Sequence, residues 1–273
     1  MDIRQRAALG ESLSGLGIID AHAHLGPLPG IPRFGDPSAQ GLVRVMDQAG
    51  ISKCLCSALL AVGPDFETGN DMVEQAMREF PDRILGMCVV DPNHPEAIVP
   101  ELEKRMGRGF VGVKIHPYNH RWYANHDRYR ILYEYANAQG LIVKSHTYND
   151  GSFGNAVCNP VLFDELAGRY PKATFILGHA GGAPWGHEES IAVARKRENV
   201  YLEVCSTLAF TSYWLKKIIA GIGDERVFYG SDMPVYDPRA ALGIVLFADI
   251  PDASKERILG LNVKRLLSRR TRR

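Results

Sequence analysis

The chain has 273 residues, enough for one large hydrophobic core, and it carries 32 basic and 31 acidic side chains. This balanced charge produces no global field that would favour a nucleic acid or a membrane surface as the partner. No apolar run reaches the roughly 18–20 residues that a membrane helix needs, and the first ten residues lack the apolar core of a secretory signal.

Short apolar segments alternate with longer amphipathic segments along the whole chain. The short segments predict eight strands, over Gly17–His24, Lys53–Leu60, Ile84–Asp91, Phe110–His116, Leu141–His146, Ala173–His179, Val200–Cys205 and Val227–Asp232. The longer segments predict helices over Pro37–Ala49, Glu67–Phe80, Pro95–Met106, Asp127–Gln139, Pro160–Tyr170, His187–Glu198, Thr211–Ala220 and Pro238–Phe247. A final helical pair is expected over Ala253–Leu267, followed by a disordered basic tail over residues 268–273.

Several predicted strands are continuous runs of Val, Ile, Leu and Phe, which is typical of parallel strands covered on both faces. Eight successive strand–helix units predict a (β/α)₈ barrel, in a single domain that spans residues 1–273. An open, doubly wound sheet is the alternative, because a count of short apolar runs is prone to error.

The first predicted strand ends in Asp20-Ala21-His22-Ala23-His24. Alternate residues of a strand point to one side, so Asp20, His22 and His24 share a face. Two imidazoles about 6–7 Å apart along a strand can both reach a single ion. The alternative is a pair of polar residues at a strand end. Asp20 either orients a ligand imidazole or caps and bridges within the barrel.

Imidazoles or carboxylates also end other predicted strands: His116, His146, His179 and Asp232. In a (β/α)₈ barrel the active site lies where the carboxyl ends of the strands meet. A single histidine beside an apolar strand is more often a structural residue. Such groups at five of eight strand ends are hard to explain as independent structural accidents. Nitrogen and carboxylate oxygen around an open position suit a catalytic zinc or a related divalent ion.

Together and in this order, these motifs resemble the amidohydrolase superfamily, and specifically the amidohydrolase-related branch that includes aminocarboxymuconate-semialdehyde decarboxylase. The resemblance extends from Ile18–Gly26 to Ile258–Leu267. Between them it includes Val111–Pro117, Gly178–Gly182 and Gly230–Pro234. The combination is specific, whereas no single motif is.

The resemblance implies that His22, His24 and His146 are metal ligands, and that Asp232 is a fourth ligand that doubles as general base. His179 would bind a second metal or stand beside the reacting water and the substrate. One divalent ion is expected, with Zn²⁺ first and Mn²⁺, Fe²⁺ or Co²⁺ as alternatives.

Lys114 has two interpretations. In two-metal members of the superfamily a lysine on the fourth strand is carboxylated and bridges the ions, and Lys114 lies on the fourth predicted strand. The Lys-x-His-Pro motif also occurs in one-metal relatives, and we favour one metal, with Lys114 as an anion contact. Substrate contacts are also expected from His116, which shares the face of Lys114, and from Arg33 in the proline-rich loop after the first strand.

Three functional hypotheses follow. The first is a metal-dependent hydrolase of a small carbonyl compound (an amide, lactone or ester), in which Asp232 accepts a proton from a metal-activated water. The alternative is a non-oxidative decarboxylase of a small aromatic or conjugated carboxylic acid that uses the same metal site. The short chain and the Lys114–Pro117 motif favour hydrolysis. The third is a barrel that binds without catalysis, against which the intact ligand set argues.

The five cysteines fit neither a disulfide framework nor a zinc knuckle, so reduced, buried thiols in a cytoplasmic protein are expected. The partner is expected to be a small-molecule substrate rather than a nucleic acid or a membrane, and a homodimer is the default assembly. The aromatic and basic segment Tyr118–Arg130 fits a pocket lining or a subunit contact better than a nucleic-acid surface.

Overall fold

Eight parallel strands follow one another around the molecule in the order of the chain. The computed structural model describes residues 1–27, 35–205 and 211–270. The strands are β1 (Ile18–Leu25), β2 (Ile51–Ala58), β3 (Ile84–Val89), β4 (Gly112–Ile115), β5 (Ile142–His146), β6 (Thr174–Gly178), β7 (Val200–Val204) and β8 (Val227–Tyr229). Each pairs in parallel with the next, so all carboxyl ends point to one side.

Backbone hydrogen bonds between β1 and the segment after β8 close the sheet. The amide of His24 donates to the carbonyl of Met233, and the amide of Asp232 donates to the carbonyl of His22, both at 2.7 Å. Ala23 and Met233 form a parallel bridge. The predicted (β/α)₈ barrel is therefore confirmed over the open-sheet alternative.

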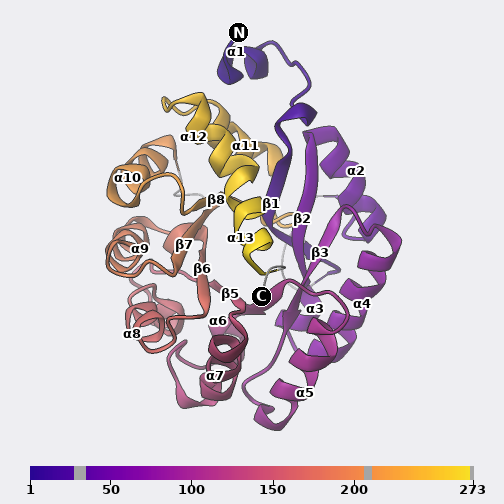
Figure 1. The fold of residues 1–273 in the computed structure, drawn as a ribbon, viewed down its shortest axis with the longest axis vertical. Helices are drawn as coiled ribbons and strands as arrows, with labels where there is room; N and C mark the ends of the chain where they lie inside the picture. Colours follow the sequence, from indigo (N-terminus) through magenta and orange to yellow (C-terminus); the bar gives the residue numbers. More distant parts are fainter. Residues whose placement is uncertain (28–34, 206–210, 271–273) are drawn as a thin grey trace.

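The main helices of the described residues surround the strands as an outer ring (Figure 1). Three of them begin at a capping residue, Ser38, Asp65 or Asp237, whose side chain accepts a hydrogen bond from the first turn. Gly50 and Gly140 end two of them in the left-handed conformation. The helices are α2 (Ala39–Ala49), α4 (Phe66–Glu79), α5 (Pro95–Met106), α7 (Arg130–Gln139), α8 (Leu162–Arg169), α9 (Pro184–Lys196), α10 (Ser212–Ile222) and α11 (Pro238–Leu246).

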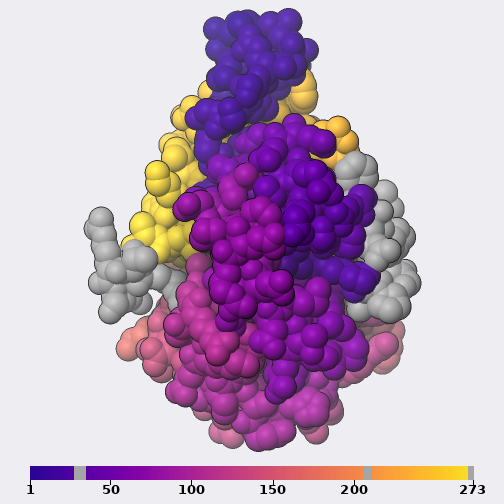
Figure 2. Space-filling view, turned by 90° about the vertical axis from the view of Figure 1, so that its right-hand side faces the viewer, coloured from indigo at the N-terminus to yellow at the C-terminus, as the bar shows by residue number. Residues whose placement is uncertain are grey.

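Shorter elements connect this ring, and the sequence predicts only part of them. They are α1 (Ile3–Ala8), η1 (Ser14–Leu16), α3 (Leu59–Val62), α6 (Pro117–His120), η2 (Asp127–Tyr129), η3 (Gly154–Cys158), η4 (His179–Gly181), α12 (Asp252–Glu256), the π-helical turn η5 (Arg257–Leu261) and α13 (Asn262–Arg270). The amino-terminal segment with α1 stands out from the rest of the molecule in Figure 2. The amide of Ile3 donates to Asp252 Oδ2 at 2.8 Å, which ties α1 to α12.

Helix α13 covers the amino-terminal end of the barrel and crosses the centre of the view in Figure 1. Its Val263 and Leu266 are buried against interior side chains of the strands, among them Ile19 and Phe228. The helix continues through Arg270, whereas the sequence predicts a disordered tail from residue 268. Residues 271–273 lie outside the described residues. Among the described helices, none has the length and apolarity that crossing a bilayer requires.

Candidate active site

A cavity of about 310 Å³ opens where the carboxyl ends of the strands meet. It contains every predicted site residue that the structure describes. The lining residues are His22, His24, Leu59, Val62, Lys114, His116, Tyr118, Asn119, His146, Tyr148, Asn155, His179, Asp232 and Val235. Arg33, predicted to contact the substrate, lies outside the described residues.

His22, His24 and Asp232 bring two nitrogens and one carboxylate oxygen together. The two Nε2 atoms are 3.2 Å apart, and Asp232 Oδ1 lies 3.4 Å from that of His22 and 3.1 Å from that of His24. Two atoms that each lie about 2.1 Å from one tetrahedral ion would be separated by about 3.4 Å. The three side chains therefore fit a single divalent ion, and their donor types are those of a catalytic zinc or manganese site.

His146, the third predicted ligand, forms a second group with His179 and His116. His146 Nδ1 lies 3.0 Å from His179 Nε2, and its ring stacks on that of His116 with the centroids 4.1 Å apart. The rings of His22 and His179 lie 4.9 Å apart, so the two groups adjoin. Metal ligation by His146 stays a prediction.

Asp20 bridges the two ends of the barrel sheet. Its Oδ1 accepts hydrogen bonds from the amides of His22, at 2.8 Å, and Ser231, at 3.0 Å, and its Oδ2 accepts one from the Ser231 hydroxyl. Burial raises the pKa of the Asp20 carboxyl to about 7, although these hydrogen bonds oppose the shift. Of the two interpretations of Asp20, these contacts support the structural bridge.

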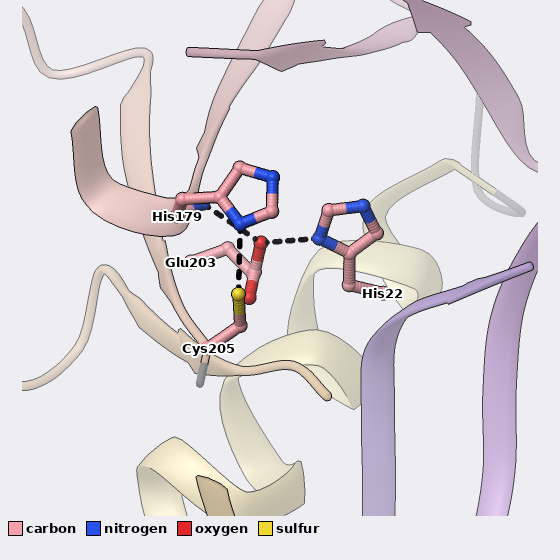
Figure 3. Close-up of side chains that lie close together, drawn as sticks. All are labelled: His22, His179, Glu203 and Cys205. Carbon is pink, nitrogen blue, oxygen red and sulfur yellow. Dashed lines mark hydrogen bonds and ion pairs between the residues drawn. The ribbon is translucent and has the colours of Figure 1, made fainter. Parts of the chain in front are cut away.

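Three buried residues of this site were absent from the sequence prediction: Lys144 on β5, and Glu203 and Cys205 at the end of β7. Glu203 lies between His22 and His179, and Cys205 Sγ lies 2.8 Å from His179 Nδ1 (Figure 3). A carboxylate inside the apolar run Val200–Cys205 was the available signal, because an ionised group rarely enters a core without a partner.

A family model described as Amidohydrolase matches residues 19–269. The chain belongs to this amidohydrolase family. A comparison with curated protein sequences gives no significant match.

Solved structures share the fold of this chain. An uncharacterised TIM-barrel protein from Bordetella bronchiseptica is 19% identical, with a TM-score of 0.77 over 93% of this chain and 99% of that chain. A 2,6-dihydroxybenzoate decarboxylase from Rhizobium is 19% identical, with a TM-score of 0.74 over 92% and 98%. A dihydroxybenzoic acid decarboxylase from Polaromonas, with bound manganese, is 20% identical, with a TM-score of 0.75 over 92% and 97%.

The backbone is strained at two residues that line the cavity, His179 and Asp232. Asp232, His179 and Ala180 have φ angles of 61°, 60° and 44°, in the left-handed region that side chains with a Cβ disfavour. Each such residue costs on the order of 1–3 kcal/mol, a cost that is common at functional sites. These φ angles change the direction of the chain after β6 and β8, and the side chains of His179 and Asp232 line the cavity.

Burial keeps the imidazoles of the site neutral. It lowers the pKa of His22, His24, His146 and His179, so each carries a lone pair at neutral pH, as metal ligation requires. Burial alone would raise the pKa of Asp232, but the hydrogen bond with His24 and the neighbouring His179 and Lys114 hold it below its usual range. The carboxylate is therefore ionised.

The side chain of Lys114, on β4, extends to the Nε2 atom of His22. Its Nζ lies 2.9 Å from His22 Nε2. Burial, together with the nearby Lys144, lowers the pKa of the Lys114 amine to about 7. An amine that is partly neutral at this point is compatible with an anion contact and with carboxylation, so both interpretations of Lys114 remain predictions.

A larger cavity, of about 640 Å³, lies at the opposite end of the barrel, beside α13. Apolar side chains such as Ile19, Leu85 and Phe110 line it, and Lys53 and Lys264 are its charged residues. Because its lining holds neither an imidazole nor a carboxylate, the chemistry belongs to the smaller cavity.

Proposed function

We propose that this amidohydrolase is a metal-dependent, non-oxidative decarboxylase of a small aromatic or conjugated carboxylic acid. The observation that carries the proposal is a group of side chains that can hold a divalent ion, His22, His24 and Asp232, in a cavity of about 310 Å³. This volume suits a small ligand. The rings of His116, His146 and Tyr148 in its wall lie nearly parallel, which favours a flat substrate.

The similar structures support the same choice. Besides the two dihydroxybenzoate decarboxylases, a 5-carboxyvanillate decarboxylase from Sphingomonas paucimobilis superposes with a TM-score of 0.73 at 19% identity over 93% of this chain and 99% of that chain. The sequence alone favoured hydrolysis, and these relatives favour the decarboxylase alternative.

His22, His24 and Asp232 would hold the divalent ion. When bound, the ion would act as a Lewis acid toward the carboxylate oxygens of the substrate. Manganese accompanies one of the similar decarboxylases, and zinc suits the same donors. Lys114, whose Nζ adjoins His22, would add positive charge beside the carboxylate of the substrate.

The reaction breaks the bond between a ring or alkene carbon and its carboxylate, and leaves the electron pair on that carbon. A proton must then replace the departing carbon dioxide. Asp232 and His179 line the cavity. The ionised Asp232 can accept a proton from water and His179 can relay one, so we assign the transfer of a water-derived proton to the ring or alkene carbon to this pair.

Hydrolysis of a small amide, lactone or ester is the second candidate. The description of the family model and the carboxylate of Asp232 beside two imidazoles support it, because the same groups can deprotonate a water.

A substrate panel distinguishes the candidates. Protein loaded with Mn²⁺ or Zn²⁺ is incubated with hydroxybenzoates, carboxyvanillate and muconates, and carbon dioxide release is measured beside turnover of lactones, esters and amides. We expect carbon dioxide release from at least one acid. Turnover of a lactone, ester or amide without gas would establish the hydrolase instead. A protein that binds no metal and converts no substrate would support the binding barrel.

A further inference from the structure

Glu203 contacts the back of the metal site rather than the cavity. Its Oε2 lies 2.8 Å from His22 Nδ1 and 3.1 Å from the backbone nitrogen of His179, and the side chain is fully buried (Figure 3). A carboxylate can only accept hydrogen bonds. Nδ1 of His22 therefore carries the proton, and the lone pair lies on Nε2, which faces His24 and Asp232.

The Nδ1 of His24 contacts the neutral residue Ser57. It lies 3.2 Å from the Ser57 carbonyl oxygen, which only accepts, and 3.1 Å from the Ser57 hydroxyl, which can donate or accept. The Nε2 of His24 faces His22 and Asp232. Neutral groups therefore orient His24, whereas a charged carboxylate orients His22.

The surrounding chain is built to admit this carboxylate. A Cβ added to Gly230 would overlap with Glu203 Oε1, so only glycine leaves room for the carboxylate at this position. Lys144 supplies the balancing charge. Its Nζ lies 3.5 Å from Glu203 Oε2 and donates to the carbonyl of Ala21 at 2.6 Å.

Stability does not explain a glutamate here. Within the described part of the chain Glu203 Oε1 has no hydrogen-bonding partner, and a buried polar atom without one is unfavourable. A buried ion pair such as that of Glu203 and Lys144 is often no more stable than apolar residues of the same size. A role toward His22 accounts for the charge.

We propose that Glu203 is a positioning residue of the metal site, which holds His22 in its Nδ1–H form and makes Nε2 a stronger ligand. This inference rests on the metal site of the proposed function. Loss of such a partner typically weakens metal binding by about 10–100-fold.

The test is metal affinity in Glu203→Gln, measured by competition between the apoprotein and a chromophoric chelator for Mn²⁺ and Zn²⁺. The amide keeps the size and one accepting oxygen but loses the charge. We expect the dissociation constant to rise about 10–100-fold. Glu101→Gln is the matched control, because Glu101 is also buried but pairs with Arg105 on α5. An affinity equal to wild type in Glu203→Gln would overturn the inference.

A second measurement keeps the inference testable if the variant does not fold. Nitrogen-15 NMR of wild-type apoprotein with labelled histidine reports which nitrogen of His22 carries the proton, with His22→Asn to assign its signals. We expect a proton on Nδ1, and a proton on Nε2 alone would refute the proposal.

The two proposals fail differently. A wild-type protein that binds metal but releases no carbon dioxide would refute the decarboxylase and leave the role of Glu203 intact. A wild-type protein that binds no divalent ion would remove the metal site, and the role of Glu203 with it.

Discussion

Asp232 contacts His22 through both its backbone and its side chain. Its backbone amide donates to the carbonyl of His22 at 2.7 Å, and its side-chain Oδ1 lies 3.4 Å from Nε2 of the same residue. The first contact closes the barrel and the second belongs to the proposed metal site. A side-chain substitution at this position therefore separates the two roles.

Asp232→Asn is expected to leave the fold intact and to remove most activity. The backbone bond to His22 remains, while an amide neither accepts a proton as readily nor binds a cation as strongly. We expect turnover to fall about 10²–10⁴-fold, the range for loss of a general acid or base. Steady-state kinetics measure the loss, and circular dichroism checks the fold. Near wild-type turnover would refute the assignment.

Removal of the metal is expected to abolish turnover and lower thermal stability. Because the ion would join β1 to the segment after β8, it binds the folded state and not the unfolded chain. At a free metal concentration about 100 times the dissociation constant, the stabilisation is about 2.7 kcal/mol. Thermal unfolding during chelation and after Mn²⁺ or Zn²⁺ is restored measures the effect. A melting temperature independent of metal would argue against ligation between the two segments.

Arg105→Met is expected to destabilise the protein strongly. The guanidinium is fully buried and contacts Glu101, Glu74 and Asp71 at 2.6, 2.7 and 2.7 Å. Without Arg105 the buried Glu101 has its next cation, Lys104, only at 3.7 Å, and removing one partner of a buried pair costs about 3–5 kcal/mol.

Urea unfolding of Arg105→Met measures this difference. Arg78→Met is the matched control, because Arg78 also pairs with Glu74 but is exposed. We expect the control to lose no more than about 1 kcal/mol. Equal losses in the two variants would contradict the importance of burial.

The environment of the Asp224 carboxyl leads us to expect that the free energy of unfolding falls in acid. Burial alone would raise the pKa of its carboxyl, but hydrogen bonds with Ser254 and Arg257 hold that pKa below the usual 3.8. The folded state thus favours the charged form. The contribution is complete above the unfolded pKa near 3.8 and is lost as the pH falls through the lower folded value.

Denaturant unfolding of wild type and Asp224→Asn at pH 7 and at successively lower pH tests this dependence. We expect Asp224→Asn to be less stable at pH 7, and the gap to wild type to narrow below about pH 4. A gap that widens in acid would have the wrong sign.

The barrel was predictable because each strand and helix has its own local pattern. Continuous apolar runs gave the eight strands, and proline and glycine gave many helix borders. The predicted bounds of strands and helices were wrong where tertiary contacts determine the end of an element. The strand predicted over Val227–Asp232 ends at Tyr229, because Asp232 adopts a positive φ while the chain continues to pair with β1. Helix α9 begins at Pro184, three residues before its predicted start.

The site was predictable only in part, for a similar reason. His22, His24 and Asp232 stand at strand ends, where a polar residue is conspicuous. Glu203 and Lys144 lie inside apolar strands, and the role of each depends on a contact with another strand. Neither the contact between Glu203 and His22 nor that between Lys144 and Ala21 can be derived from spacing along the chain.

The closure between β1 and residues 232–233 also bears on biosynthesis. The ligands of the proposed metal site come from opposite ends of the chain, 210 positions apart between His22 and Asp232. A nascent polypeptide that has not yet released residue 232 from the ribosome has the two imidazoles of this set but lacks its carboxylate. Tight capture of the ion should therefore await translation beyond residue 232, which limits premature loading with a competing metal.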